Sequence, residues 1–166
     1  PVTEEELCRC LSGFIGVQKQ PPPPYSAVKY KGKPLYYYAR RGIRVEKQPR
    51  QIRVDSLGLE GFDREKARLR IAVRCSPGTY IRVLAAEIGR QLGCGAHLVG
   101  LRRIASGGFS VADALPGRKL EGRDSEWLLR QAMIPLDKAL AACADSPGEM
   151  PGVEAGGNQS IMDVQP

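Results

Sequence analysis

The stretch that most constrains the fold of this chain is a strand pattern that passes directly into a helix pattern. Over Arg68–Cys75, larger apolar residues and Cys75 occupy every second position and three arginines lie between them, which is the two-residue period of a half-buried strand. Over Ile81–Leu92, apolar residues recur at steps of three and four, which forms the stripe of an amphipathic helix. Pro77-Gly78 supplies the turn between the two patterns. We therefore predict that Tyr80 and Arg82 lie in the first turn of a helix at the edge of a sheet.

Thr79 follows the turn and is expected to cap this helix through its hydroxyl. Tyrosine and arginine side chains at such a junction are often only packed or solvated, so the junction alone does not assign a function. The junction does place the phenol of Tyr80 and the positive charge of Arg82 between a strand and a helix, which are both rigid elements.

Shorter elements surround this junction. Thr3 and Glu6 form a capping-box pattern that predicts a helix at the start. A strand over 51–60 changes the parity of its apolar residues near Asp55-Ser56, which predicts a β-bulge there. This strand is expected to form an antiparallel hairpin with the strand over 68–75. The other predicted elements are a strand over 98–104 and helices over 35–41, 125–133 and 136–142.

The length of 166 residues suffices for one sizeable core. No apolar run approaches the roughly 18 residues that a membrane-spanning helix needs, and no secretory leader pattern stands at the start. The five cysteines form no Cys-x-x-Cys pair and His97 is the single histidine, so neither a zinc site nor a disulfide framework is expected. We therefore expect a cytoplasmic protein with reduced thiols, no membrane contact and no metal.

Positive charge is concentrated in the first two thirds of the chain, whose formal net charge is +7. Residues 18–53 hold ten Lys or Arg against one acid, and residues 64–103 hold nine against two. All six tyrosines lie within residues 25–80. Basic side chains interleaved with aromatic rings suit a polyanion that carries stackable bases, which indicates RNA. The alternative is a basic surface that serves only solubility.

A run of four prolines over 21–24 excludes helix and imposes extended polyproline geometry. Such a run is often a flexible linker or a ligand of an SH3-type domain. Here it continues directly into the short strand pattern of Tyr25–Lys29. We therefore interpret it as a stiff connection that fixes the positions of Tyr25 and Lys29.

Four motif segments occur in order. They are Pro23-Pro24-Tyr25-Ser26-Ala27-Val28-Lys29; Leu35-Tyr36 with Ala39-Arg40 and Gly42; Cys75-Ser76-Pro77-Gly78-Thr79-Tyr80-Ile81-Arg82; and Leu92-Gly93-Cys94-Gly95-Ala96-His97 with Leu101-Arg102-Arg103. Taken together, they resemble the TruB-type tRNA pseudouridine synthases. Any one segment is a weak match, but four with family-like spacing over about the first 110 residues are highly specific.

The resemblance implies a mixed α/β (α+β) fold with a largely antiparallel sheet, flanking helices and an active-site cleft across the sheet. It implies that a uridine in the T-arm loop of tRNA is isomerised to pseudouridine without a cofactor or metal. The target nucleotide would be flipped out of the RNA stack. An aspartate would attack, the glycosidic bond would break, and the uracil would rotate and rejoin through carbon 5.

The resemblance also implies two catalytic residues in this chain. Tyr80 is similar to the family's active-site tyrosine near the flipped base, which is the candidate for handling the carbon-5 proton. Arg82 is similar to the arginine that pairs with the catalytic aspartate. Both agree with the prediction from the residues alone, which puts them at the start of a helix beside a sheet.

Five further residues are implied to bind the substrate. Leu101 is similar to the apolar residue that packs against the base, and we expect its side chain to be buried. Tyr25 and Lys29 resemble residues that line the cleft. Arg102 and Arg103, which follow Leu101, are the remaining candidates.

The chain departs from the family at the nucleophile. In the family that aspartate lies in a Gly-x-Leu-Asp motif upstream of the Pro-Pro-x-Tyr-Ser segment, whereas the first aspartate here is Asp55, in a predicted strand without the motif. We therefore expect residues 1–115 to be the C-terminal half of a synthase catalytic domain. Residues 116–145 are expected to be a helical extension, and residues 146–166 a disordered tail. The expected partners are tRNA and the N-terminal half of the same protein.

Two functions stay open on the sequence alone. The first is an enzyme, in which this chain is part of a tRNA pseudouridine synthase and is inactive by itself. The second is a non-catalytic RNA-binding module or an inactive relic. A basic DNA-binding domain is less favoured, because the sequence shows no helix-turn-helix or zinc-finger pattern.

Overall fold

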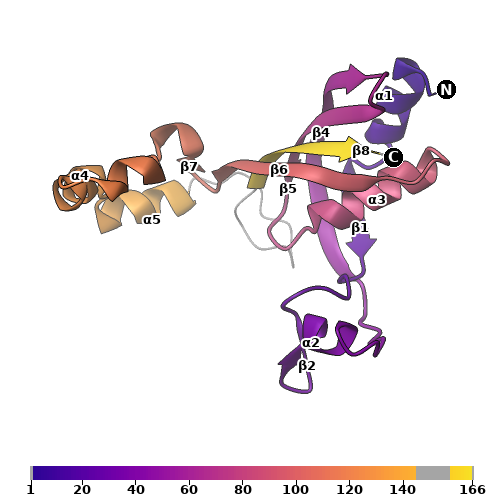
Figure 1. Ribbon diagram of the computed structural model, residues 1–166, viewed down its shortest axis with the longest axis horizontal. Helices are drawn as coiled ribbons and strands as arrows, with labels where there is room; N and C mark the ends of the chain where they lie inside the picture. Colours follow the sequence, from indigo (N-terminus) through magenta and orange to yellow (C-terminus); the bar gives the residue numbers. More distant parts are fainter. Residues whose placement is uncertain (1, 145–157, 166) are drawn as a thin grey trace.

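A computed structural model describes residues 2–144 and 158–165 of the chain (Figure 1). Its centre is a six-stranded sheet in which neighbouring strands pair in the order β1-β4-β5-β8-β6-β7, every pair antiparallel. The strands are β1 (Gly16–Gln20), β4 (Arg50–Asp63), β5 (Arg68–Cys75), β6 (His97–Ser106), β7 (Phe109–Ser110) and β8 (Asn158–Gln165). The α/β class with a largely antiparallel sheet and flanking helices is therefore confirmed.

Two helices cover one face of this sheet. They are α1 (Glu4–Ser12), which begins with the predicted capping box of Thr3 and Glu6, and α3 (Ile81–Gln91). Leu7 and Leu11 of α1 join Leu84 and Ile88 of α3 in one core, and each of these side chains is at most 2% exposed. Their apolar stripes stabilise the fold by removing that surface from water.

The predicted strand-turn-helix junction is confirmed. Along β5, Leu69, Ile71, Val73 and Cys75 are buried beneath the helices, while Arg68, Arg70 and Arg74 are exposed on the opposite face. Gly78 has a φ of 78°, which favours glycine, and it turns the chain from β5 towards α3. The junction thus joins a half-buried strand to a helix that packs on the same sheet.

The predicted β-bulge is confirmed as well. The register of β4 against β5 shifts between Val54 and Ser56, and it shifts again between Leu59 and Gly61. The first shift leaves Asp55 without a partner on β5, so Val54 and Leu57 both point into the core. Strand β4 also runs to Asp63, farther than the sequence predicts.

The predicted disordered tail over 146–166 is wrong where the structure describes it. Residues 146–157 and 166 lie outside the described residues, whereas Asn158–Gln165 form β8, an interior strand of the sheet. Ser160, Met162 and Val164 alternate on its buried face, each at most 3% exposed. Few large apolar residues mark this segment, so its pattern is weak without knowledge of the neighbours that it pairs with.

A small basic unit lies beyond the end of the sheet (Figure 1). It consists of the hairpin β2 (Lys29–Tyr30) and β3 (Lys33–Pro34), followed by α2 (Leu35–Ala39). The strand predicted over Tyr25–Lys29 is absent from these described residues, because the chain bends there and pairs only at Lys29–Tyr30.

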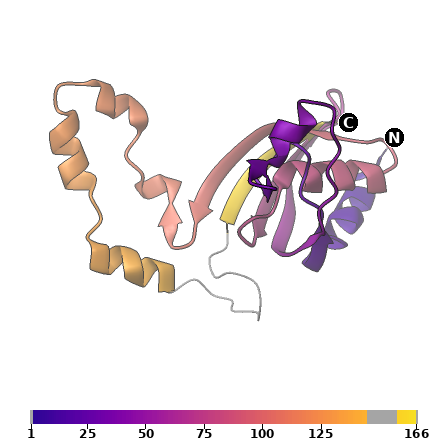
Figure 2. The ribbon, with the colours of Figure 1, turned by 90° about the horizontal axis from the view of Figure 1, so that it is seen from below.

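The helices predicted over 125–133 and 136–142 are confirmed, and they follow two short helical turns. This segment contains the short 3-10 helices η1 (Val111–Asp113) and η2 (Gly117–Glu121), then α4 (Ser125–Ala132) and α5 (Leu136–Ala144). These helices lie past the end of β6 and β7, away from α1 and α3 (Figure 2).

Candidate functional site

The candidate site begins where β5 ends and α3 starts. Tyr80 is the residue immediately before α3, and Arg82 is the second residue of the helix. The predicted cap by Thr79 is wrong, because the Thr79 hydroxyl donates to the carbonyl oxygen of Ser76 at 2.9 Å and leaves the helix end uncapped by a side chain. Short-range bonds of this kind compete with capping in Ser and Thr.

Gln20, the last residue of β1, binds both the backbone amide and the backbone carbonyl of Tyr80 through its side chain. The Tyr80 amide donates to Gln20 Oε1 at 2.7 Å, and Gln20 Nε2 donates to the Tyr80 carbonyl oxygen at 3.3 Å. The Gln20 residue is only 7% exposed. Because a buried carboxamide with its bonds satisfied has little freedom, Gln20 fixes the start of α3 against the edge of the sheet.

Ser76 fixes the turn between β5 and α3 to strand β4. Its amide donates to the Arg53 carbonyl oxygen at 2.8 Å, and its hydroxyl accepts from the Arg53 amide at 3.0 Å. The sequence singled out neither Gln20 nor Ser76 as a site residue. The sequence places Gln20 beside the proline run and Ser76 beside the Pro77-Gly78 turn. It does not indicate that these two polar side chains are buried, because their burial depends on distant segments.

Arg82 joins two of the motif segments. Its guanidinium donates to the carbonyl oxygen of Tyr25 and lies 5.5 Å from the centre of the Tyr80 ring. Tyr25 and Arg82 are both exposed to solvent. Within residues 2–144 and 158–165, no carboxylate forms a salt bridge with Arg82. The charge of Arg82 is therefore available to an anionic group from elsewhere.

Strand β6 brings two of its three candidates to the face that carries α3. Leu101 pairs with Met162 and Arg103 with Ser160, and both partners point into the helix-covered face. Arg102 pairs with Ile161 and so points to the opposite face. The three candidates therefore do not form one cluster.

Arg103 lies near the strand-turn-helix junction. Burial raises the pKa of the Cys75 thiol, whereas a hydrogen bond with Thr79 and the positive charge of Arg103 act to lower it. Arg103 pairs with Ser160 of β8, and Ser160 pairs in turn with Val73, two residues before the end of β5.

The expectation that Leu101 is buried is wrong. Its side chain is 52% exposed, and β6 lies near the edge of the sheet, where β7 pairs with it only at Ala105 and Ser106. An exposed leucine beside a basic site offers an apolar surface to a partner.

The basic unit carries a dense set of rings and cations. In this tyrosine–cation cluster, Arg41 lies 3.6 Å and Lys33 4.3 Å from the ring centre of Tyr37. The cluster comprises Tyr30, Tyr36, Tyr37, Tyr38, Lys31, Lys33, Arg40, Arg41 and Lys47. Lys29, a predicted substrate-binding residue, is exposed at the start of the same unit.

The cluster changes the acidity of one phenol. Lys33 Nζ donates to the Tyr37 hydroxyl oxygen at 2.9 Å, and this bond, with the charge of Arg41, lowers the pKa of Tyr37. Cations that stabilise a phenolate would also stabilise a phosphate.

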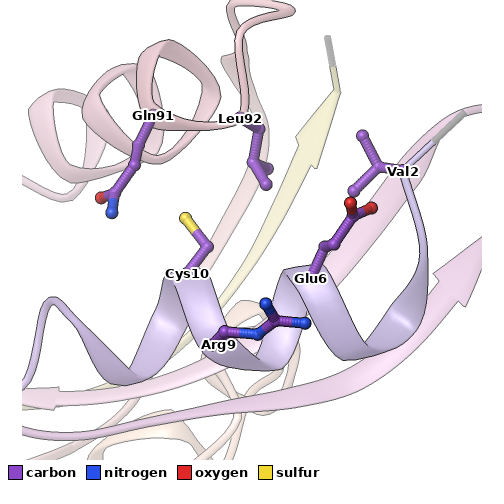
Figure 3. A pocket seen from close by; sticks show the side chains of 6 residues that line it. All are labelled: Val2, Glu6, Arg9, Cys10, Gln91 and Leu92. Carbon is purple, nitrogen blue, oxygen red and sulfur yellow. The ribbon is translucent and has the colours of Figure 1, made fainter.

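A separate cleft of about 560 Å³ lies between α1 and the end of α3 (Figure 3). It is lined by Val2, Glu6, Arg9, Cys10, Gln91 and Leu92, none of which is a candidate residue. Burial raises the pKa of the Cys10 thiol, which keeps it protonated and unreactive. The described part of the chain contains no cluster of His, Cys, Asp or Glu suited to a metal and no helix long and apolar enough to cross a membrane.

Two family models match the chain one after the other. The model described as "TruB family pseudouridylate synthase (N terminal domain)" matches residues 1–81, and the one described as "tRNA pseudouridylate synthase B C-terminal domain" matches residues 82–141. Together they cover Tyr80 and Arg82 as well as the tyrosine–cation cluster.

Curated relatives agree with these models. A protein of Desulfotalea psychrophila named tRNA pseudouridine synthase B is 54% identical over 114 residues, which are 67% of this chain and 46% of that protein. Proteins of the same name from Opitutus terrae and Methylobacillus flagellatus are 50% and 44% identical, over 69% and 72% of this chain and 47% and 39% of their own lengths. The chain thus spans less than half the length of these relatives. It belongs to the TruB family of pseudouridine synthases.

Proposed function

We propose that this chain forms part of a cytoplasmic tRNA pseudouridine synthase that isomerises a uridine in the T-arm loop of tRNA. The observation that carries the proposal is the start of α3, where Arg82 reaches the Tyr25 carbonyl oxygen beside the Tyr80 ring. Two segments that are 57 residues apart in the sequence meet there. Both are segments on which the family resemblance depends.

The reaction breaks the bond between N1 of uracil and C1′ of the ribose and forms a bond between C5 and C1′. The proton at C5 is lost and N1 gains one, so no oxidant, reductant or cofactor is needed. In this scheme an aspartate is the nucleophile, and the Arg82 guanidinium holds it ionised through bidentate pairing. The Tyr80 phenol handles the C5 proton.

The RNA-binding part of the proposal is supported by the tyrosine–cation cluster. Its exposed cations suit the phosphate backbone, and its rings suit unstacked bases. Lys29 and Arg103 are further exposed cations, and the half-exposed Leu101 offers an apolar contact for the flipped uracil. Arg102, on the opposite face, is the least suited of the predicted substrate-binding residues.

A second function, RNA binding without catalysis, is favoured by one observation. Within residues 1–166 no aspartate stands in a Gly-x-Leu-Asp motif. Asp55, the first aspartate, forms a salt bridge with Arg53 on β4. We therefore propose that the chain alone binds RNA but does not turn it over, because electrostatic stabilisation does not replace a covalent nucleophile.

The test is tritium release from a T-arm hairpin labelled at carbon 5 of uridine. The chain alone should release none, and a complete synthase that contains this chain should release tritium at every turnover. In the complete enzyme, Arg82→Lys should lower kcat by at least about 100-fold, because it removes a planar ionic contact at the reacting group.

The matched control is Arg90→Lys on the same helix, where the arginine is exposed and pairs with Glu87. It should leave turnover unchanged. Binding without release in the complete protein would favour the non-catalytic module. Release by the chain alone would mean that another carboxylate attacks.

A further inference from the structure

Strand β8 reaches an interior position of the sheet from the far end of the described chain. It lies between β5 and β6 and is antiparallel to both. Within the described residues, β5 and β6 do not pair with each other. β8 follows α5 in the described chain after residues 145–157. The contacts that β5 and β6 make with β8 show which residues this interior position accepts.

One face of this groove is apolar. Val164, Met162 and Ser160 lie opposite Leu69, Ile71 and Val73, and all six side chains are at most 6% exposed. The groove thus demands a small residue at position 160 and apolar residues at positions 162 and 164. A larger side chain at position 160, or a polar one at position 162 or 164, would meet the core beneath α1 and α3.

The other face selects a carboxylate. Asp163 pairs with Arg70 at 3.1 Å between Nε and Oδ1. Gly100 of β6 stands opposite Asp163, and a Cβ atom there would lie 3.1 Å from Asp163 Oδ2. The glycine therefore leaves room for the carboxylate, while Arg70 supplies its countercharge.

The ends of the strand are also recognised. The Ser106 hydroxyl donates to the side-chain oxygen of Asn158 at 2.9 Å, and Gln165 Nε2 donates to the Lys66 carbonyl oxygen at 3.3 Å. These contacts fix the register of an eight-residue strand.

We propose that the interval between β5 and β6 is a strand-binding groove whose ligand is the segment 158–165, held as a peptide that need not be connected to the rest of the chain. Backbone hydrogen bonds to two strands supply affinity, and the alternating side chains supply specificity, as in other cases of strand addition. Because β6 joins the α3-bearing part of the sheet through β8, the bound segment also positions Leu101 and Arg103.

The experiment begins with the full chain, carrying a specific protease site within residues 145–157, and cleaves it after folding. The released C-terminal fragment should stay with the body in gel filtration. A fluorescent synthetic peptide of residues 158–165 should then exchange with it, as measured by anisotropy. Circular dichroism should show that the sheet is retained after exchange.

Two peptide variants provide the specificity test. Met162→Asp should bind at least about 100-fold more weakly, because it would bury an unpaired carboxylate. Gln159→Ala, at an exposed position, should bind within about threefold of the parent. In the cleaved chain, Gly100→Val should weaken the parent peptide but should affect an Asp163→Gly peptide less.

The proposal would be overturned if the labelled peptide failed to exchange into the cleaved and still folded protein. Equal affinity of the parent and Met162→Asp peptides would overturn it as well, since binding would then not depend on the groove. Neither measurement uses RNA or turnover, so the result is independent of the proposed function.

Discussion

Replacing Gln20 by alanine should loosen the start of α3 and destabilise the fold. The substitution removes both hydrogen bonds between the Gln20 carboxamide and the Tyr80 backbone. The Tyr80 carbonyl oxygen also accepts from Val83 and Leu84 at 3.0 and 3.1 Å, so it remains satisfied. The Tyr80 amide loses its 2.7 Å partner, and this loss dominates the cost.

The expected size follows from that single lost acceptor. Removing one partner of a part-buried hydrogen bond costs about 1–3 kcal/mol, and some of it is recovered if water enters. We therefore expect the free energy of unfolding to fall by about 1.5 kcal/mol. With a urea dependence of about 2 kcal/mol per molar, the midpoint should fall by roughly 0.7 M.

The assay is urea denaturation followed by circular dichroism, with Gln51→Ala as the matched control. Gln51 lies on the adjacent strand β4 and is exposed, so its truncation should change the midpoint by less than about 0.25 M. Equal midpoints for Gln20→Ala and Gln51→Ala would refute the reasoning. In a complete synthase, Gln20→Ala should also lower kcat, because Tyr80 would no longer be held in place.

Three further outcomes are expected. Leu101→Ala should change the free energy of unfolding by no more than about 0.5 kcal/mol, since the side chain is 52% exposed, while lowering turnover of a complete synthase; a loss near 2 kcal/mol would make Leu101 a core residue. Tyr37 should lose its phenolic proton at a lower pH than a tyrosine in an unfolded chain, because Lys33 and Arg41 stabilise the phenolate, and Lys33→Met should raise that pKa in an absorbance titration. Gly89→Ala should cost about 3 kcal/mol or prevent folding, because its Cβ would overlap the backbone nitrogen of Ala96.

The local half of the fold was predictable because its patterns are strong and short in range. The alternation along β5 and the stripe of α3 specify buried faces without reference to distant residues. The parity change at Asp55 likewise marks a bulge within one strand. Tyr80 and Arg82 lie at the end of these elements, so their position followed from the same patterns.

The missed features depend on contacts between distant segments. β8 has only a weak pattern of its own and becomes a strand through pairing with β5 and β6. Gln20 becomes a site residue because β1 ends beside Tyr80, which is 60 residues away in the sequence. Leu101 was expected to be buried from the resemblance alone, and its exposure accompanies the position of β6 near the edge of the sheet. Long-range pairing of this kind is not encoded in a local period.

The two register shifts in β4 bear on how this strand could change length in evolution. Asp55 and Glu60 are the only residues between Val54 and Asp63 that lack a partner on β5. Deleting either one would leave every pair of the β4–β5 ladder in place and would keep Leu57 and Phe62 on the core side. A one-residue deletion at a paired position would instead turn the rest of the strand inside out. A deletion scan along β4 should therefore find that the fold tolerates loss of Asp55 or of Glu60. We expect related proteins to differ in length at these two positions but not at the paired residues between them.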